Sequence, residues 1–218
     1  MAEATLIISS KNYSSWSLRG WLMAKWAGLD FVEQIASSDD PSVRAELLLR
    51  SSSILVPTLV HNGLTIWDTL AIGEYLNELY PQVGLLPRDV EARARCRSIC
   101  GEMHSGFAAL RSALPVNLRA RKPGFVVWSA AQTDIDRILT IWRECFARRK
   151  GPYLFGEHLT LADAMYAPVC TRFRTYCVTL DHEADDYCER IMGLPTMVEW
   201  ITAALQEPEE MPELDAEF

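Results

Sequence analysis

The sequence predicts an α/β domain over residues 1–83, a linker over 84–90 and an all-α domain over 91–218. Short β-rich segments alternate with helical patterns up to Pro81, and after Pro87 helical periodicity continues without any strand pattern. A chain of 218 residues that is 49% hydrophobic is long enough to bury a core in both parts. These observations favour one small α/β domain joined to a helical one.

The N-terminal part begins with a β-α-β pattern. Residues 5–8 are β-rich, residues 16–26 place apolar side chains at helical spacing as far as Gly28, and residues 31–35 have the composition of a second strand. A right-handed crossover makes two such strands parallel. A short helix is expected at 43–49.

A hairpin and a helix complete the expected sheet. Asn62-Gly63 is the strongest kind of short hairpin turn, so the apolar runs on either side of it predict two antiparallel strands. Asp68 or Thr69 then caps a helix that stops before Pro81. Together these elements predict a mixed four-stranded sheet with helices on both faces.

The C-terminal part is expected to contain helices only. Thr133 is expected to cap one of them, with Asp134 in its first turn, and Thr160 with Asp163 forms a variant of the capping box at the start of another. The predicted spans are 91–114, 133–149, a helix that begins at Thr160, and 194–205.

Composition excludes several classes of partner. The net charge of −8 argues against a nucleic-acid surface, and no stretch approaches the ~20 apolar residues that span a bilayer. Much of the charge lies after Leu205, where we expect a solvated acidic tail that begins with Glu207. The N-terminus starts acidic and runs directly into a strand pattern, unlike a signal peptide, so we expect a cytoplasmic location.

The chain contains six cysteines, none of them in a Cys-x-x-Cys pair. In a reducing cytosol these side chains are expected to be free thiols that pack as small apolar residues. Cys100 and His104 stand four apart and could share a helix face, but two ligands do not make a zinc site. No metal is therefore expected.

A proline lies near the start of the third expected strand, at Val56-Pro57. Proline cannot donate to a β ladder. We therefore expect the hydrogen-bonding edge beside it to serve a peptide-like ligand. The alternative is a trans proline on an ordinary edge strand.

Three motifs in order resemble the cytosolic glutathione transferase family, and the match covers essentially the whole chain. The Val-Pro pair at 56–57 resembles that family's valine with cis-proline, and residues 68–72 resemble its Glu-Ser-x-Ala-Ile helix start. Residues 155–163 resemble its Gly-x-x-x-(Ser/Thr)-x-Ala-Asp signature. The resemblance implies a thioredoxin-like N-terminal domain, a helical C-terminal domain and a homodimer.

The resemblance also implies how glutathione, a tripeptide thiol, would dock as co-substrate without a metal. Val56, before a cis Pro57, would offer its backbone N–H and C=O to the cysteinyl unit. Thr69 would bind the γ-glutamyl carboxylate at a helix N-terminus, and Asp68 would pair with the ammonium group. Plain helix capping by Asp68 and Thr69 is the alternative.

The start of the first helix resembles the serine-type region of the zeta-like classes, Ser-Ser-Cys-Ser-Trp-Arg-Val-Arg. An ungapped match puts Asn12 at the usual catalytic serine. The chemistry needs a thiolate, and a hydroxyl donor with first-turn N–H groups would lower the thiol pKa. Ser14 is the first choice for that donor, followed by Ser15, then Asn12 through its amide, then Tyr13. At least one serine is expected to cap the helix instead.

The electrophile would lie between the two domains. The expected contacts from the helical part are His104, Phe107, Arg111 and Trp128, and further candidates are Asn117 and Arg119. Arg111 and Arg119 would suit an anionic substrate. A buried structural histidine and solvated arginines are the alternatives.

The resemblance therefore predicts a glutathione transferase that activates the glutathione thiol for attack on an electrophilic small molecule, in detoxification. A glutathione-dependent isomerase of the maleylacetoacetate isomerase kind is one alternative, and a non-catalytic glutathione-binding scaffold is another. No cysteine lies within the N-terminal motifs, which argues against cysteine-type relatives and against a glutaredoxin.

Overall fold

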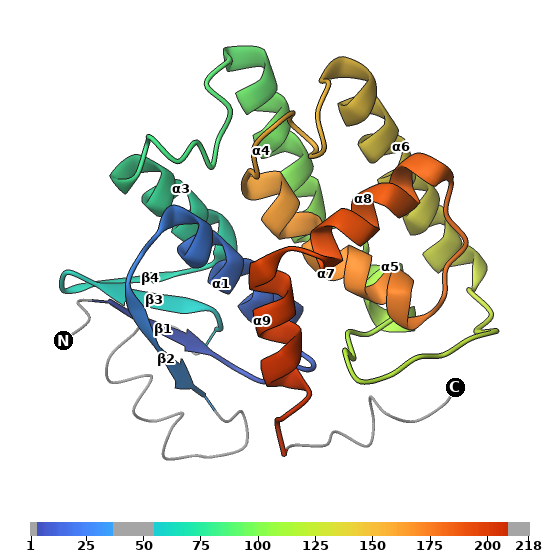
Figure 1. Ribbon diagram of the computed structural model, residues 1–218, viewed down its shortest axis with the longest axis horizontal. Helices are drawn as coiled ribbons and strands as arrows, with labels where there is room; N and C mark the ends of the chain where they lie inside the picture. The colour runs from blue at the N-terminus through green and yellow to red at the C-terminus, as the bar shows by residue number, and fades with distance from the viewer. Residues whose placement is uncertain (1–3, 37–54, 209–218) are drawn as a thin grey trace.

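The computed structural model describes residues 4–36 and 55–208, and a four-stranded sheet forms its N-terminal part (Figure 1). The strands are β1 (Ala4–Ile8), β2 (Phe31–Ile35), β3 (Thr58–His61) and β4 (Leu64–Trp67), in the spatial order β2-β1-β3-β4. β1 runs parallel to β2 and antiparallel to β3, and β3 and β4 form an antiparallel hairpin. The predicted mixed sheet is confirmed.

Helices α1 (Ser15–Ala27) and α3 (Thr69–Leu79) pack against each other over one face of this sheet (Figure 1). α1 ends at Gly28, whose φ of 75° is a left-handed conformation that glycine adopts without strain. Asp68 is the N-cap of α3. The helix expected at 43–49 lies outside the described residues.

The second part is helical, apart from an isolated β-bridge between Tyr153 and Gly156. Its central helix, α7, packs against α1, α4 and α8 and begins with the expected capping box. The helices described are α4 (Val90–Ser105), α5 (Ala108–Ala113), α6 (Ser129–Arg148), α7 (Leu161–Thr175), α8 (His182–Met192) and α9 (Pro195–Ala204).

The single helix predicted over 91–114 is wrong, because the chain turns between α4 and α5. Phe107 has a φ of 58°, which is a left-handed conformation and breaks the helix. Gly106 precedes it, and a Cβ atom there would lie 2.7 Å from the Glu102 carbonyl oxygen. A glycine is therefore needed at this turn.

The predicted start of the next helix is also wrong. α6 begins at Ser129, and Thr133 lies one turn inside it with its hydroxyl donating to the Ser129 carbonyl (3.1 Å). Asp134, expected in a first turn, instead accepts a hydrogen bond from the Leu110 N–H of α5 (2.9 Å). The acid thus caps a neighbouring helix across space.

α1 lies between the sheet and the helical part. It packs against β1 and α3 on one side and against α7 and α9 on the other. Trp21 of α1 and Trp200 of α9 are buried, with ring centroids 5.3 Å apart. Gly20 lets Pro57 approach closely, since a Cβ atom at that position would lie 2.6 Å from the proline Cγ. The first turn of α1 is therefore held at the junction of the two parts.

Candidate active site

Ser14 caps α1 with its own hydroxyl. Its Oγ accepts a hydrogen bond from the Ser17 backbone N–H (3.2 Å) and donates one to the Ser17 hydroxyl (2.9 Å). The same Ser17 oxygen accepts from the Ser9 backbone N–H (3.0 Å). The serine that the sequence favours as thiol donor is thus engaged within the turn.

Ser15, the first residue of α1, has a buried side chain whose hydroxyl forms no hydrogen bond with any described residue. The backbone N–H groups of Ser15 and Trp16 also lack partners in the described parts of the chain, as the first N–H groups of a helix do. These donors lie at the positive end of the helix dipole. A hydroxyl and two N–H groups are therefore available together at the start of α1.

Asn12 is fully buried, and both ends of its amide are used within the protein. Nδ2 donates to Asn117 Oδ1 (3.1 Å), and Oδ1 accepts from the Arg119 backbone N–H (3.1 Å). These bonds join the turn between β1 and α1 to the helical part. Tyr13, half-buried beside it, donates its backbone N–H to Ser10 Oγ (3.3 Å).

In the segment before β3, the backbone groups of Val56 have no partner among the described residues. The Val56–Pro57 peptide bond is cis, and Val56 is half-buried. Sheet pairing begins only at Thr58, opposite Ile7, and the Val56 N–H and C=O form no hydrogen bond with described residues. Within the described part of the chain, this edge therefore offers one donor and one acceptor that no other residue uses.

The N-terminus of α3 carries the other two residues predicted to bind glutathione. Asp68 Oδ1 accepts from the Leu70 N–H (2.8 Å), and Oδ2 lies 2.5 Å from Nε2 of His104 in α4. Thr69 is buried, and its Oγ1 has no hydrogen-bond partner among the described residues. A buried hydroxyl without a partner is unfavourable, so this position suits a ligand acceptor.

Two arginine side chains and His104 lie around the ring of Trp16. The Trp16 ring centroid lies 5.3 Å from the His104 ring, 4.4 Å from the Arg19 guanidinium carbon and 5.7 Å from that of Arg111. Arg111 forms no hydrogen bond or ion pair with a described residue. Arg19 is buried and donates from Nε to the Met165 carbonyl (2.8 Å), while its two Nη atoms have no described partner.

The charge of Arg19 is uncompensated within the described residues. Burial lowers its pKa well below the usual value, and repulsion from Arg172 and Arg111 adds to the effect. Burial also lowers the pKa of Arg172 to about 10. Because buried cations are normally paired, this group of arginines favours an anion as its missing partner.

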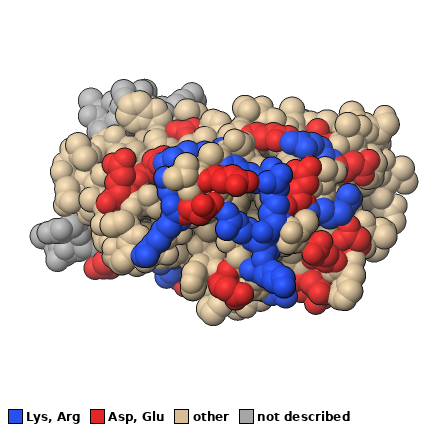
Figure 2. Space-filling view, turned by 90° about the horizontal axis from the view of Figure 1, so that it is seen from above, with Lys and Arg blue, Asp and Glu red and all other residues tan. Residues whose placement is uncertain are grey.

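Arginines at another face of the molecule are paired. Over the N-terminal end of α4 and the C-terminal end of α6, basic and acidic side chains are interspersed (Figure 2). The ion pairs there are Arg149–Asp89, Arg148–Glu91 and Arg95–Glu144. A groove of about 600 Å³ beside them is lined by the linker between α3 and α4 and by the loop before α7. These offset charges distinguish that groove from the group around Trp16.

The structure separates the residues predicted to contact the electrophile. His104 and Arg111 meet at Trp16. Phe107 is buried in the core as the N-cap residue of α5. Trp128, 64% exposed, lines a different cavity of about 190 Å³ beside α5 and α6. Of the four predicted residues, only His104 and Arg111 therefore lie together.

Arg119 and Glu207 have structural partners within the protein. Arg119 Nε donates to the Ala204 carbonyl (3.1 Å). The expected solvated tail is wrong at its first acid: Glu207 accepts from Ser10 Oγ (2.7 Å) and from the Lys11 N–H (2.6 Å). The cause is a turn with several free donors, which a carboxylate can satisfy at once.

Trp16 and Arg19 were not predicted as site residues. Both match the zeta-like motif, whose tryptophan and final arginine fall on them in the ungapped alignment. That match was the sequence feature that could have identified them. No sequence feature pointed to Glu207, because its partners lie almost two hundred residues earlier in the chain.

The six cysteines are all free, and only Cys177 among them is not buried. Burial raises the pKa of Cys100 and raises that of Cys145 to about 11. In the described part of the chain, no three His, Cys, Asp or Glu side chains gather as a metal site would require. Nor does any helix there have the length and apolar character needed to cross a membrane.

Two family models match the chain: the glutathione S-transferase N-terminal domain over residues 13–79 and the glutathione S-transferase C-terminal domain over residues 91–203. The chain belongs to the glutathione S-transferase family. The family and the two-part fold predicted from the motifs are thereby confirmed.

This glutathione S-transferase family member is 29% identical over 155 residues to a probable maleylacetoacetate isomerase of Caenorhabditis elegans, which covers 71% of this chain and 72% of that protein. It is 32% identical over 125 residues to the maleylacetoacetate isomerase of Rattus norvegicus, covering 57% of this chain and 56% of the rat protein. It is 29% identical over 158 residues to glutathione S-transferase 1 of Dianthus caryophyllus, and this match covers 71% of this chain and 70% of the Dianthus protein. The match thus spans little more than half of the rat protein.

Solved structures share the fold of this family member. A glutathione transferase homologue from Burkholderia, with bound glutathione, has a TM-score of 0.71 at 24% identity and covers 95% of this chain and 100% of its own. A glutathione S-transferase from Rhodospirillum rubrum has a TM-score of 0.70 at 21% identity and covers 94% and 93%. At these identities the likeness concerns the fold.

Proposed function

We propose that the chain is a glutathione transferase, in which residues 1–83 bind glutathione and residues 91–218 hold an electrophilic small molecule. One observation carries the proposal: polar groups that have no partner among the described residues surround the first half of α1. They are the Val56 N–H and C=O, the buried Thr69 hydroxyl and the Ser15 hydroxyl. A tripeptide thiol with a carboxylate can satisfy all of them.

These groups belong to one neighbourhood. Pro57, next to Val56, packs on Gly20 of α1. Asp68, next to Thr69, meets His104, which contacts the Trp16 ring beside Ser15. In the proposal, Thr69 binds the γ-glutamyl carboxylate, Asp68 the ammonium group and Val56 the cysteinyl backbone.

Ser15, rather than Ser14, is the proposed donor to the glutathione sulfur. A free thiol has a pKa of about 8.5, and each unit of depression corresponds to about 1.4 kcal/mol of preferential thiolate stabilisation. The Ser15 hydroxyl and the first N–H groups of α1 have no partner among the described residues and could serve this task. Ser14 fixes the turn, and Asn12 ties it to the helical part.

The electrophile in this proposal carries a negative charge. Arg111 lies over the Trp16 ring with no described partner, and the buried Arg19, over the same ring, adds a second cation that no described acid compensates. A carboxylate is the simplest anion that an arginine side chain binds with two hydrogen bonds.

A glutathione-dependent cis–trans isomerase is the second candidate. It would use the same thiolate, which adds to the substrate and is then eliminated without net consumption of glutathione. The relatives named maleylacetoacetate isomerase and the unpaired arginines favour it.

The family resemblance also supports a homodimer. Light scattering should then give about twice the chain mass of 24.6 kDa. A concentration-independent mass of one chain would refute this part of the proposal.

Titration calorimetry with reduced glutathione, followed by electrophile assays, tests the function. We expect binding, a thiolate absorbance at neutral pH, and turnover of chlorodinitrobenzene or of a carboxylate-bearing electrophile. Isomerisation of a maleyl substrate at constant glutathione would favour the second candidate. Binding without turnover of any substrate would indicate a non-catalytic scaffold, and no binding at millimolar glutathione would refute the proposal.

A further inference from the structure

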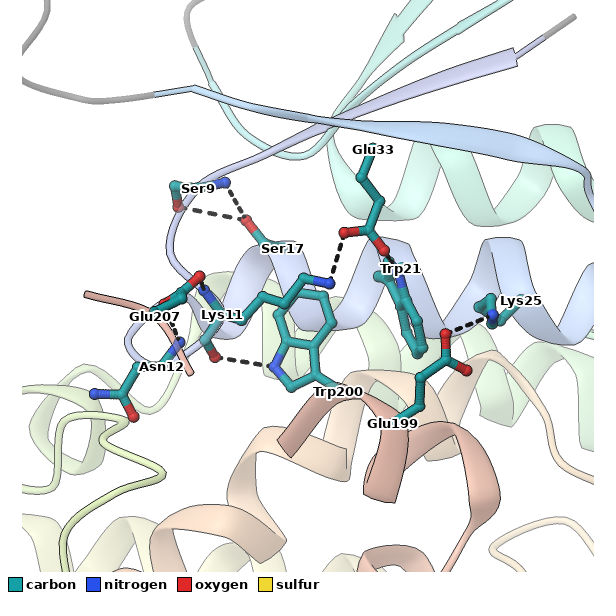
Figure 3. A network of polar contacts seen from close by, with 10 residues as sticks. All are labelled: Ser9, Lys11, Asn12, Ser17, Trp21, Lys25, Glu33, Glu199, Trp200 and Glu207. Carbon is teal, nitrogen blue, oxygen red and sulfur yellow. Dashed lines mark hydrogen bonds and ion pairs between the residues drawn. The ribbon is translucent and has the colours of Figure 1, made fainter. Parts of the chain in front are cut away.

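The carboxylate of Glu207 occupies the turn between β1 and α1 (Figure 3). Oε1 accepts from the Lys11 N–H (2.6 Å), and Oε2 accepts from the Asn12 N–H (3.1 Å) and from Ser10 Oγ (2.7 Å). One side chain from beyond α9 thus satisfies three donors in the turn that precedes the candidate thiol-activating residue.

The rest of this turn is held by the same part of the chain. The Lys11 carbonyl accepts from Trp200 Nε1 (2.9 Å), and the Asn12 carbonyl accepts from the Leu118 N–H (3.3 Å). With Glu207, these bonds engage both backbone groups of Lys11 and of Asn12. Every one of these partners comes from the helical part or the segment after it.

The hydrogen-bond donors to the Glu207 carboxylate are two backbone N–H groups and a hydroxyl. The Lys11 ammonium group pairs with Glu33 of β2 (2.6 Å) and lies 5.2 Å from the Trp200 ring centroid, so it does not neutralise Glu207 (Figure 3). Arg119 donates to the Glu207 backbone carbonyl. The carboxylate is therefore stabilised by N–H and O–H donors, and such charge-assisted bonds are about twice as strong as neutral ones.

We propose that Glu207 is a positioning residue for thiol activation. By fixing residues 10–12 it fixes the cap at Ser14, and this sets where the Ser15 hydroxyl and the first N–H groups of α1 meet the sulfur. The inference rests on the proposed function. It separates activation, which depends on Glu207, from glutathione binding at Val56 and Thr69, which does not.

Glu207→Gln tests this role, because glutamine replaces one acceptor oxygen with an NH2 group facing backbone donors. Glu199→Gln is the matched control. Glu199 of α9 also bonds to the N-terminal part, through Lys25 of α1 (2.8 Å), but this ion pair is on the exposed surface. Each variant is compared with wild type in glutathione affinity, in the pH dependence of turnover and in the ultraviolet absorbance of bound thiolate.

In Glu207→Gln we expect the apparent pKa of the bound thiol to rise by about half a unit to one unit. Turnover below that pKa should then fall about threefold to tenfold, because the rate follows the thiolate fraction. The glutathione dissociation constant should stay within about twofold, and Glu199→Gln should resemble wild type. Amide hydrogen exchange at Lys11 and Asn12 should speed up in Glu207→Gln alone.

An unchanged pH profile in an active Glu207→Gln protein would overturn the inference while leaving the proposed function intact. So would an equal loss of affinity and turnover in both variants, which would indicate general destabilisation. If Glu207→Gln does not fold, Glu207→Asp replaces it, and the same shift in thiol pKa is expected. Wild-type protein that fails to bind glutathione would instead refute the proposed function, and the positioning role with it.

Discussion

Two adjacent serines at the start of α1 have different hydrogen-bond duties, and this difference can be tested. Ser14 caps the helix through Ser17, whereas the Ser15 hydroxyl has no described partner. Ser15→Ala should therefore lower turnover about tenfold and raise the apparent thiol pKa, with little change in thermal stability. Kinetics across pH and a melting curve measure both effects.

Ser14→Ala is the matched comparison at the same scale. Loss of an N-cap destabilises a helix by about 1 kcal/mol, so this variant should melt earlier. Its loss of turnover should be smaller than that of Ser15→Ala. A larger catalytic loss in Ser14→Ala, at unchanged stability, would reverse the assignment of the donor.

Thr69→Val should separate affinity from stability. The Thr69 hydroxyl is buried without a described partner, so its removal should leave the free protein as stable as wild type or more so. If the hydroxyl binds the glutathione carboxylate, affinity should fall by about 1.5–3 kcal/mol, as for hydrogen bonds to charged groups. Calorimetry and thermal unfolding measure the two quantities, and an unaltered dissociation constant would remove Thr69 from the site.

Arg111→Gln should change substrate preference rather than general activity. Arg111 lies beside Trp16 without an acidic partner in the described residues, so its loss should raise KM for a carboxylate-bearing electrophile about tenfold and leave KM for a neutral one nearly unaffected. Arg148→Gln is the control, because Arg148 is paired with Glu91 on the surface. Equal effects on both electrophiles would count against an anion site.

Residue roles could be proposed where a family motif covers the residue. Val56, Asp68 and Thr69 were proposed because the family resemblance assigns them to glutathione, and a helix N-terminus suits an anionic group. The choice between Ser14 and Ser15 was not predictable, since it depends on which of the two hydroxyls hydrogen-bonds to Ser17. These assignments for glutathione remain predictions.

At the scale of elements, Gly20 explains how α1 and the start of β3 approach each other. Alanine at an open helix position is about 1 kcal/mol more favourable than glycine. At Gly20, however, the added Cβ would lie 2.6 Å from Pro57 Cγ, so Gly20→Ala should destabilise the protein and weaken glutathione binding. Thermal unfolding and calorimetry measure this outcome.

Gly101→Ala in α4 is the control, because no atom lies within 4 Å of its Cβ position. It should raise the free energy of unfolding by up to about 1 kcal/mol, and the melting temperature should rise with it. If Gly20→Ala were equally stabilising, the close approach of Pro57 would not limit this position.

Most elements and their order were predictable from hydrophobic periodicity and turn residues, but α8 (His182–Met192) was not predicted and the ends of other helices were wrong. Apolar spacing continues across Gly106, so the break between α4 and α5 was missed although a glycine marked it. The start of α6 was misplaced because Asp134 resembles a first-turn acid, and its real partner is Leu110 on another helix. A contact across space accounts for Asp134, whereas the break between α4 and α5 is local to Gly106 and Phe107.

For the whole molecule, the burial of its thiols predicts their chemistry. Five of the six cysteines are buried, and the pKa of Cys145 is raised to about 11 by burial. Since the thiolate is the reactive form, native protein at pH 8 should react with a thiol reagent at one site, Cys177. Six equivalents should react in denaturant, and rapid native labelling of two or more would contradict the packing.

The two-part architecture was predictable from the sequence, whereas the joint between the parts was not. Both flanks of α1 are buried, one by α3 and the sheet and the other by α7 and α9. The apolar pattern of 16–26 shows that α1 is buried but does not identify which segments cover it. The interdomain bonds of Asn12 and Glu207 depend on partners more than a hundred positions away.

Synthesis of the chain proceeds from the first strand to the last helix, yet the turn at residues 10–12 is completed by Glu207. A nascent chain on the ribosome therefore carries Ser15 through the synthesis of almost two hundred further residues without the contact proposed to set its position. Reactivity toward glutathione should accordingly emerge late and all at once, when residue 207 has cleared the exit tunnel and joined a turn made some two hundred residues earlier.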